Sequence, residues 1–217
     1  MTIAVKICGL KTADTLDAAL DAGADYIGLV FFPPSPRHVA DFALARDLAD
    51  QARGRAGIVV LTVDADDALL ERIAETTAPD IFQLHGSETV ARAREIAARS
   101  GAQVMKVIKV STTTDTTAAR DYAAPDGPCR MVLFDAKAPP GAKLPGGNGL
   151  AFEWRHLETV PDDIRYMLSG GLTSENVAAA VRLTRACAVD VSSGVERAPG
   201  EKDADRIRAF IAAAKSV

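Results

Sequence analysis

The sequence lacks any segment long enough to cross a membrane. Its 217 residues contain no run of about 18 apolar residues, which is roughly what a transmembrane helix requires. The first residues also lack a charged stretch followed by a long apolar core, so no signal peptide is evident. We therefore expect a cytoplasmic protein that does not interact with a membrane.

An excess of charge of one sign is also absent. There are 25 Lys and Arg residues against 29 Asp and Glu residues, which gives a formal net charge of -4. Such a balance argues against nucleic acid or an anionic membrane surface as a partner, so attraction for any anionic ligand must be local. Hydrophobic residues make up 48% of the chain, enough for a full core and too many for a disordered protein.

Cysteine is scarce, with Cys8, Cys129 and Cys187 only and no CxxC motif, so a zinc or redox site is not predicted. Cys129 and Cys187 begin apolar runs and are expected to be buried, whereas Cys8 ends one. If these runs are parallel strands of about five residues, roughly 17 Å separates Cys8 from the other two. That distance rules out a disulfide between Cys8 and either of them.

Apolar, β-rich runs alternate with helical patterns along the chain. Strand-helix alternation indicates a parallel sheet, and eight repeats in this length predict a single α/β domain over residues 1–217, a closed (β/α)8 TIM barrel. A doubly wound open sheet is the alternative, although no GxGxxG follows the first strand. Strands are expected near 3–8, 25–31, 57–63, 80–85, 103–109, 130–135, 165–169 and 187–191.

Most of the expected helices begin with Asp, Ser or Thr, which are good N-cap residues. They span 14–22, 41–53, 66–77, 87–100, 174–185 and 203–215. The pattern over 112–123 is weak because a run of Thr disfavours helix. A loop rich in Pro and Gly covers 139–149, before a short helix near 150–157.

Chemically reactive side chains lie where the expected strands end. Because side chains alternate between the two faces of a strand, the apolar neighbours are expected to face outward and the polar residues inward. Active sites of such barrels lie at the carboxyl ends of the strands, and buried polar groups are costly unless paired. The inward set is Lys6, Cys8, Gln83, His85, Asp135 and Asp190.

Three loops look suited to bind anions. Segments 168–174 and 191–196 follow the last two strands and carry Gly170, Gly171, Ser193 and Gly194. Small residues let backbone N–H groups approach an anion, and the loops after strands seven and eight often bind phosphate in these barrels. The proline-stiffened loop over 31–39 carries Arg37, whose guanidinium suits a carboxylate.

Read together, these motifs resemble the phosphoribosylanthranilate isomerase family of tryptophan biosynthesis, over nearly the whole chain. The segments that carry the resemblance are Lys6–Leu10, Gly28–Phe31, Ser35–Arg37, Gln83–Gly86, Phe134–Asp135, Ser169–Leu172 and Val189–Glu196. The family commonly shows Gly-Gly-Thr-Gly and Phe-Asp-Trp after strand six, where this chain has Gly146-Gly147-Asn148-Gly149 and Phe152-Glu153-Trp154.

The resemblance implies an Amadori rearrangement of N-(5-phosphoribosyl)anthranilate to 1-(2-carboxyphenylamino)-1-deoxyribulose 5-phosphate, without a cofactor or metal. Asp135 matches the general acid and Cys8 the general base, whose thiolate we expect Lys6 and the helix start near Thr12 to stabilise. Arg37 matches the residue that holds the anthranilate carboxylate. The two Gly loops match the phosphate site, and an orienting role is expected for His85 and Asp190.

Three alternatives remain open. An indole-glycerol-phosphate synthase would be expected to use a catalytic lysine, and a sugar-phosphate epimerase metal ligands or paired aspartates. A non-catalytic binder of a phosphoribosyl ligand would keep the Gly loops without needing Cys8 and Asp135. Both residues are present, which favours the isomerase. The sequence leaves monomer and homodimer equally open.

Overall fold

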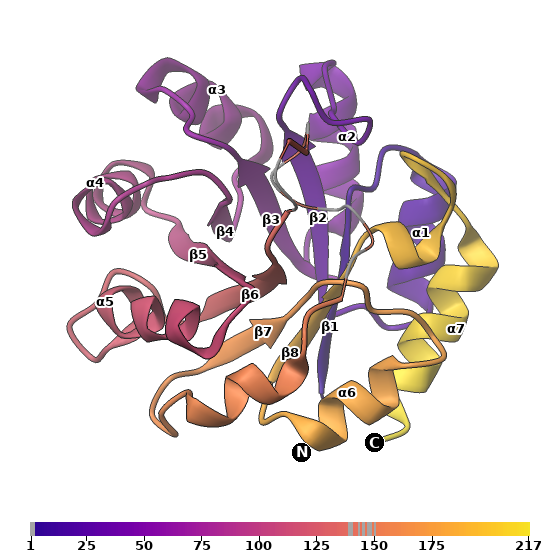
Figure 1. The fold of residues 1–217 in the computed structure, drawn as a ribbon. Coiled ribbons are helices and arrows are strands. Elements are labelled where there is room, and N and C mark those ends of the chain that lie inside the picture. The colour runs from indigo at the N-terminus through magenta and orange to yellow at the C-terminus, as the bar shows by residue number, and fades with distance from the viewer. Residues whose placement is uncertain (1–2, 139–140, 143, 145, 147–148, 150) are drawn as a thin grey trace.

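The structure is a computed structural model that describes residues 3–138, 141–142, 144, 146, 149 and 151–217. Within these residues, eight parallel strands close into a barrel in sequential order, and helices surround them (Figure 1). The expected (β/α)8 barrel is confirmed, and each strand lies within two residues of its expected bounds. The strands are β1 (Ala4–Cys8), β2 (Tyr26–Phe31), β3 (Gly57–Thr62), β4 (Ile81–Leu84), β5 (Gln103–Val110), β6 (Val132–Ala136), β7 (Tyr166–Leu168) and β8 (Ala188–Val191).

The helices outside the barrel begin largely where the sequence predicts. Capping side chains from Thr12, Asp41, Asp66, Thr89 and Asp203 accept backbone N–H groups of the first turn of their helices. The α-helices are α1 (Ala13–Asp21), α2 (Phe42–Ala52), α3 (Asp67–Thr77), α4 (Val90–Ser100), α5 (Ala119–Ala123), α6 (Val177–Leu183) and α7 (Ala204–Lys215).

Three segments differ from expectation. The weak pattern over 112–123 forms a 3-10 helix, η1 (Thr113–Ala118), followed by the single-turn α5. After β6 the chain forms another 3-10 helix, η2 (Trp154–Thr159), where a helix near 150–157 was expected. After β8 come η3 (Ser193–Val195) and an unexpected antiparallel hairpin, β9 (Glu196–Ala198) with β10 (Glu201–Lys202).

Strand alternation divides the barrel into apolar and polar layers, as predicted. Val5, Ile7 and their counterparts on the other strands face the helices in the main core. Inside the barrel, one apolar layer consists of Val59, Ile81, Met105, Val107, Leu133, Met167 and Ala188. Residues two positions further along the strands share this inner face, which places Gln83, Asp135 and Asp190 above the layer, at the carboxyl ends.

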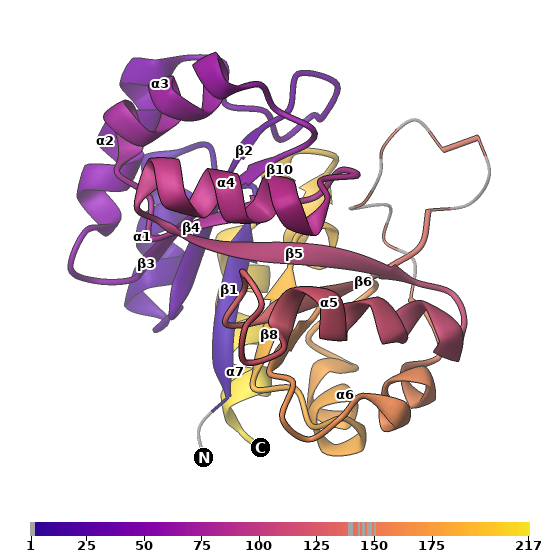
Figure 2. The same cartoon turned by 90° about the vertical axis from the view of Figure 1, so that its left-hand side faces the viewer.

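The barrel closes between its first and last strands. β1 pairs with β8 in parallel register, with Lys6 opposite Asp190 and Ile7 opposite Val191. The last helix, α7, packs against both β1 and α1, and Figure 2 shows α7 beside β1. Residues from opposite ends of the chain therefore meet at the centre of the barrel.

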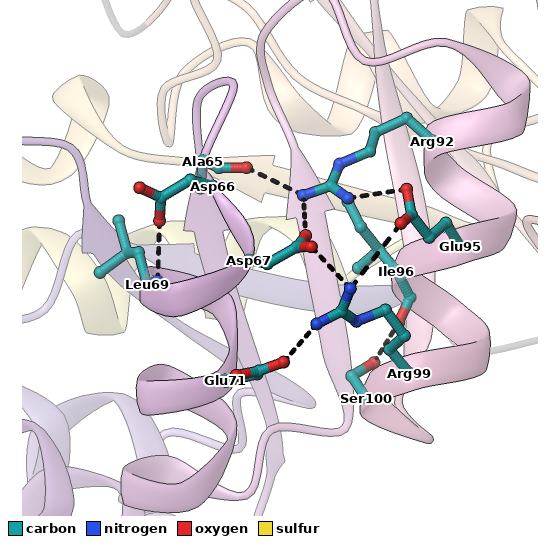
Figure 3. Close-up of polar contacts among 10 residues, drawn as sticks. All are labelled: Ala65, Asp66, Asp67, Leu69, Glu71, Arg92, Glu95, Ile96, Arg99 and Ser100. Carbon is teal, nitrogen blue, oxygen red and sulfur yellow. Dashed lines mark hydrogen bonds and ion pairs between the residues drawn. The ribbon is translucent and has the colours of Figure 1, made fainter.

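On the outside, α3 and α4 are joined by an ionic network (Figure 3). Asp67 of α3 accepts from Arg92 and Arg99 of α4, both at 2.6 Å, and Arg99 also pairs with Glu71. These side chains are largely solvent-exposed, where ion pairs contribute little individually. The network therefore fixes the register of the two helices more than it stabilises the fold.

The structure also tests the expectations about membrane-spanning segments and cysteines. Among the described residues, no helix combines the length and apolar character needed to cross a membrane. All three cysteines are free; Cys129 is buried as expected, but Cys187 is partly exposed, so that part of the prediction is wrong.

Candidate active site

A cavity opens at the carboxyl ends of the strands, with about 810 Å³ of space that is partly open to solvent. Its size suits a small-molecule ligand. The nine residues expected from the sequence to be catalytic or to bind substrate all line it: Cys8, Arg37, His85, Asp135, Gly170, Gly171, Asp190, Ser193 and Gly194. The structure therefore brings together residues spread over nearly the whole chain.

Cys8 ends β1 beside a buried ion pair. Lys6 Nζ lies 2.8 Å from Asp190 Oδ1, and Ser169 Oγ donates to Asp190 Oδ2 at 3.1 Å. Both carboxylate oxygens of Asp190 thus accept from protein donors. Gly28 of β2 leaves room for this group, because a Cβ there would lie 3.0 Å from Cys8 Sγ and 3.2 Å from Lys6 Nζ.

Burial governs the ionisation of Cys8. It raises the pKa of the thiol; the Lys6 ammonium acts in the opposite direction, while the Asp190 carboxylate raises the thiol pKa further. Burial alone would lower the pKa of Lys6, but Asp190 and Cys8 hold it above its ordinary value, so Lys6 stays charged. Lys6 favours the thiolate as expected, but burial outweighs this effect, so the pKa of the thiol is raised and the expected lowering is not found.

Asp135 ends β6 on the same inner face. Burial, together with the Asp190 carboxylate, raises its pKa to about 7, and the bond from the Ala136 N–H to Oδ1 at 2.9 Å only partly offsets this. His85 lies next to it, with Nε2 3.6 Å from Asp135 Oδ2. An acid with a pKa near neutrality is suited to proton transfer.

The two Gly loops pack directly against each other. A Cβ on Gly194 would lie 2.0 Å from the carbonyl oxygen of Leu172, and one on Gly171 would lie 2.5 Å from the Ala151 nitrogen. Gly170 has φ +89°, a conformation that other residues rarely adopt. A side chain at Gly194 would push the two Gly loops apart, whereas one at Gly171 would collide with Ala151 in the segment after β6.

Arg37 lies at the edge of the cavity in a buried ion pair that was not predicted. Its Nε and Nη2 donate to the two carboxylate oxygens of Glu196, at 2.7 and 2.9 Å. Gly9 allows the arginine to lie this close to β1, because a Cβ there would be 2.8 Å from Arg37 Cδ. The plane of the guanidinium is thereby fixed.

Some site residues were missed from the sequence. Gly146 lies against the acid, since a Cβ on it would be 2.3 Å from His85 Nε2 and 2.7 Å from Asp135 Oδ2. Gly147 and Asn148 lie outside the described residues, and Asn148 is the position of this turn at which the chain departs from the family pattern. Lys202 was not noticed, because nothing in its sequence context distinguishes it from a surface lysine.

A second buried pair, which was not predicted either, lies beside the loop after β4 that begins with His85. Lys106 Nζ lies 2.8 Å from Glu88 Oε2 and donates to the Gly86 carbonyl at 2.6 Å. Glu88 Oε1 in turn accepts from the Asp64 N–H at 2.9 Å. The pair therefore joins the loops after β3 and β4.

Comparison with known proteins gives a consistent result. The model of the family N-(5'phosphoribosyl)anthranilate (PRA) isomerase matches residues 5–213. The N-(5'-phosphoribosyl)anthranilate isomerase of Bradyrhizobium sp. (strain ORS 278) is 56% identical over 216 residues, covering 100% of this chain and 97% of the relative.

Solved structures that resemble this chain include phosphoribosylanthranilate isomerases. A structure of monomers generated from the dimeric phosphoribosylanthranilate isomerase of Thermotoga maritima matches with a TM-score of 0.84 and 33% identity, covering 99% of this chain and 100% of that one. A phosphoribosylanthranilate isomerase in complex with reduced 1-(o-carboxyphenylamino)-1-deoxyribulose 5-phosphate matches with a TM-score of 0.84 and 32% identity over the same shares. With a family model spanning the barrel and a relative of this similarity, the chain belongs to the phosphoribosylanthranilate isomerase family.

Proposed function

We propose that this protein isomerises N-(5-phosphoribosyl)anthranilate to 1-(2-carboxyphenylamino)-1-deoxyribulose 5-phosphate in tryptophan biosynthesis. The proposal rests on one observation: the Cys8 thiol at the end of β1 and the Asp135 carboxyl on β6 line the same cavity, and the pKa of Asp135 is raised to about 7. Family membership supports the same reaction.

In the proposed mechanism, Asp135 donates its proton to the ring oxygen of the ribose. The bond between C1 and this oxygen breaks, which leaves an open-chain Schiff base. Cys8, as the thiolate, then removes the proton from C2 to give an enol amine. The ketone forms as C1 gains a proton and the C2 hydroxyl loses one, so the overall change is an isomerisation that needs neither metal nor cofactor.

The remaining residues hold the substrate in this proposal. Gly170, Gly171, Ser193 and Gly194 bind the phosphate through the loops after β7 and β8, and Arg37 binds the anthranilate carboxylate. His85 orients Asp135, beside which it lies. Asp190 acts at the substrate site by holding Lys6 next to Cys8.

The test is to replace the acid and the base separately and follow the loss of substrate fluorescence. General acid-base groups typically contribute about 10²–10⁴-fold, so Cys8→Ala and Asp135→Asn should each lower kcat by that order. KM should change much less, because the anchors for phosphate and carboxylate remain. Cys8→Ser should also be poor, since a hydroxyl is hardly ionised near neutral pH.

Cys129→Ala is the matched control, because Cys129 is buried but does not line the cavity, and its kcat should stay close to that of the wild type. A folded Cys8→Ala variant with near-wild-type kcat would contradict the mechanism. Absence of turnover by the wild type would favour the alternative of a phosphoribosyl-ligand binder.

We also propose that the enzyme works in the cytoplasm as a monomer or a homodimer. A dimeric relative is known from the Thermotoga maritima structure. Sedimentation equilibrium distinguishes the two states, and assemblies larger than a dimer would contradict the proposal.

A further inference from the structure

The hairpin β9–β10 packs against the loop that carries Arg37. Gly200, at the turn of the hairpin, has φ +80°, and a Cβ on it would lie 2.4 Å from the carbonyl oxygen of Pro36. Lys11 Nζ donates to the same carbonyl at 2.8 Å. The backbone just before Arg37 is therefore held between β1 and the hairpin.

The first residue of the hairpin holds the Arg37 side chain. Glu196 accepts from Arg37 through both carboxylate oxygens, and the two side chains are 4% and 7% exposed. Bidentate pairs of this kind fix the orientation as well as the position of a guanidinium. Water has little access to the pair and therefore does not compete for the hydrogen bonds between Arg37 and Glu196.

The last residue of the hairpin completes the arrangement. Lys202 Nζ lies 2.8 Å from Glu196 Oε1 and also donates to Ser192, at 2.9 Å to the carbonyl and 3.1 Å to Oγ. Ser192 Oγ in turn donates to the Cys8 carbonyl at 3.1 Å. Lys202 thus connects the loop after β8, the end of β1 and the carboxylate that holds Arg37.

The three connected side chains carry an excess of positive charge. Arg37 and Lys202 share the single carboxylate of Glu196, so the cluster carries one net positive charge beside the cavity. Without Lys202, Arg37 and Glu196 would neutralise each other, which would weaken attraction for an anionic ligand.

We propose that Glu196 and Lys202 are positioning residues that set the orientation of Arg37 and the net charge of the cluster around it, and thereby determine the preference for a substrate whose aryl amine carries a carboxylate. This inference rests on the proposed function.

The experiment compares Lys202→Met, Lys202→Arg and the wild type on two substrates, N-(5-phosphoribosyl)anthranilate and its analogue without the carboxyl group. For Lys202→Met, KM for the carboxylated substrate should rise about tenfold, the equivalent of one charge-assisted hydrogen bond. KM for the analogue should change much less. Because the Lys202 ammonium also lowers the pKa of Cys8, kcat should fall by the same factor on both substrates, and Lys202→Arg should restore KM. Lys215→Met serves as the control, because Lys215 lies on α7 away from the cavity.

The pH dependence of the wild type provides a second measurement that needs no variant. Burial lowers the pKa of Lys202 to about 8, although Glu196 and Cys8 favour its charged form and Arg37 opposes it. Of the neighbouring charged and titratable groups, Glu196, Cys8 and Arg37 have the largest effects on it, and Arg206 donates to the Glu196 carbonyl. The ratio of the two KM values should therefore shift against the carboxylated substrate above pH 8, and the titration of Cys8 should cancel in the ratio.

The outcomes are distinct. An equal rise in KM for both substrates, an unchanged KM in a folded Lys202→Met variant, or a KM ratio independent of pH between 7 and 9 would each overturn the positioning role. Failure of the wild type to convert N-(5-phosphoribosyl)anthranilate would instead overturn the proposed function.

Discussion

Cys8 and Asp135 lie on the inner face of the barrel, and burial raises the pKa of both groups. In the proposed mechanism, the reactive form pairs a Cys8 thiolate with a protonated Asp135. Because the thiol holds its proton more tightly than the carboxyl does, this form is a minority at neutral pH. The Lys6 ammonium makes it accessible by favouring the thiolate.

The raised pKa of Asp135 predicts a stability cost that can be measured. Its pKa in the folded protein, about 7, lies above its ordinary value of 3.8. The contribution of this carboxyl to stability is therefore fully present below about pH 4 and is lost as the pH rises through 7. Asp135→Asn should be more stable than the wild type at pH 8, by up to roughly 4 kcal/mol, and the difference should vanish near pH 4.

Urea denaturation at the two pH values checks this prediction. The exposed Asp163 supplies the control, since Asp163→Asn should change the free energy of unfolding little at either pH. An Asp135→Asn variant less stable than the wild type at pH 8 would contradict the raised pKa, because it would mean that the folded protein stabilises the Asp135 carboxylate.

The sequence indicated the reactive residues well and the supporting residues poorly. Cys8, His85 and Asp135 were recognisable because such side chains are unusual at the ends of apolar strands. The sequence did not show that the pKa of the Cys8 thiol is raised, because this shift depends on burial and on the pairing of Asp190 with Lys6. Lys202 was missed because a lysine in a short polar segment is normally solvent-exposed.

At the scale of elements, prediction succeeded where the pattern was long and regular. The β-rich runs gave the strands of the barrel, whereas the segments after β5 and β6 became 3-10 helices. The Thr run and the Pro- and Gly-rich loop there disfavour α-helix. The hairpin β9–β10 was missed because strands of three and two residues have no recognisable alternation.

The loops after β7 and β8 work as one element, which predicts a specific effect of Gly194→Val. Any side chain at Gly194 must displace the Leu172 carbonyl, which would lie 2.0 Å from its Cβ, so both loops lose the geometry proposed for phosphate. KM should rise at least about tenfold, the equivalent of one charged hydrogen bond. Steady-state kinetics would show it, and an unchanged KM would exclude this loop from the phosphate site.

Gly101→Ala is the matched control for loss of a glycine. Gly101 ends α4 in the left-handed region with nothing near its Cβ position. The variant should be destabilised by roughly 1–2 kcal/mol and should keep the wild-type KM.

At the scale of the whole molecule, β1 pairs with β8, so the first and last strands of the barrel lie in one closed sheet, and we propose that the chain forms a single domain. We therefore expect one cooperative unfolding transition for residues 1–217. Far-UV circular dichroism and the fluorescence of Trp154, the single tryptophan, should give coincident denaturation curves. Phe134 lies in the buried core, so Phe134→Ala should lower the free energy of unfolding by roughly 3–5 kcal/mol and move both curves to lower denaturant concentration together. Separate midpoints for the two signals would contradict a single domain.

The pairing of Lys6 with Asp190 also has a consequence for synthesis on the ribosome. The first strand emerges early, but the partner that neutralises its buried ammonium is translated only near the end of the barrel. Until then, a nascent chain exposes the unpaired edge of β1, with Lys6 still lacking its carboxylate partner Asp190. The order of translation therefore keeps this centre unformed until β8 has been made and the barrel closes.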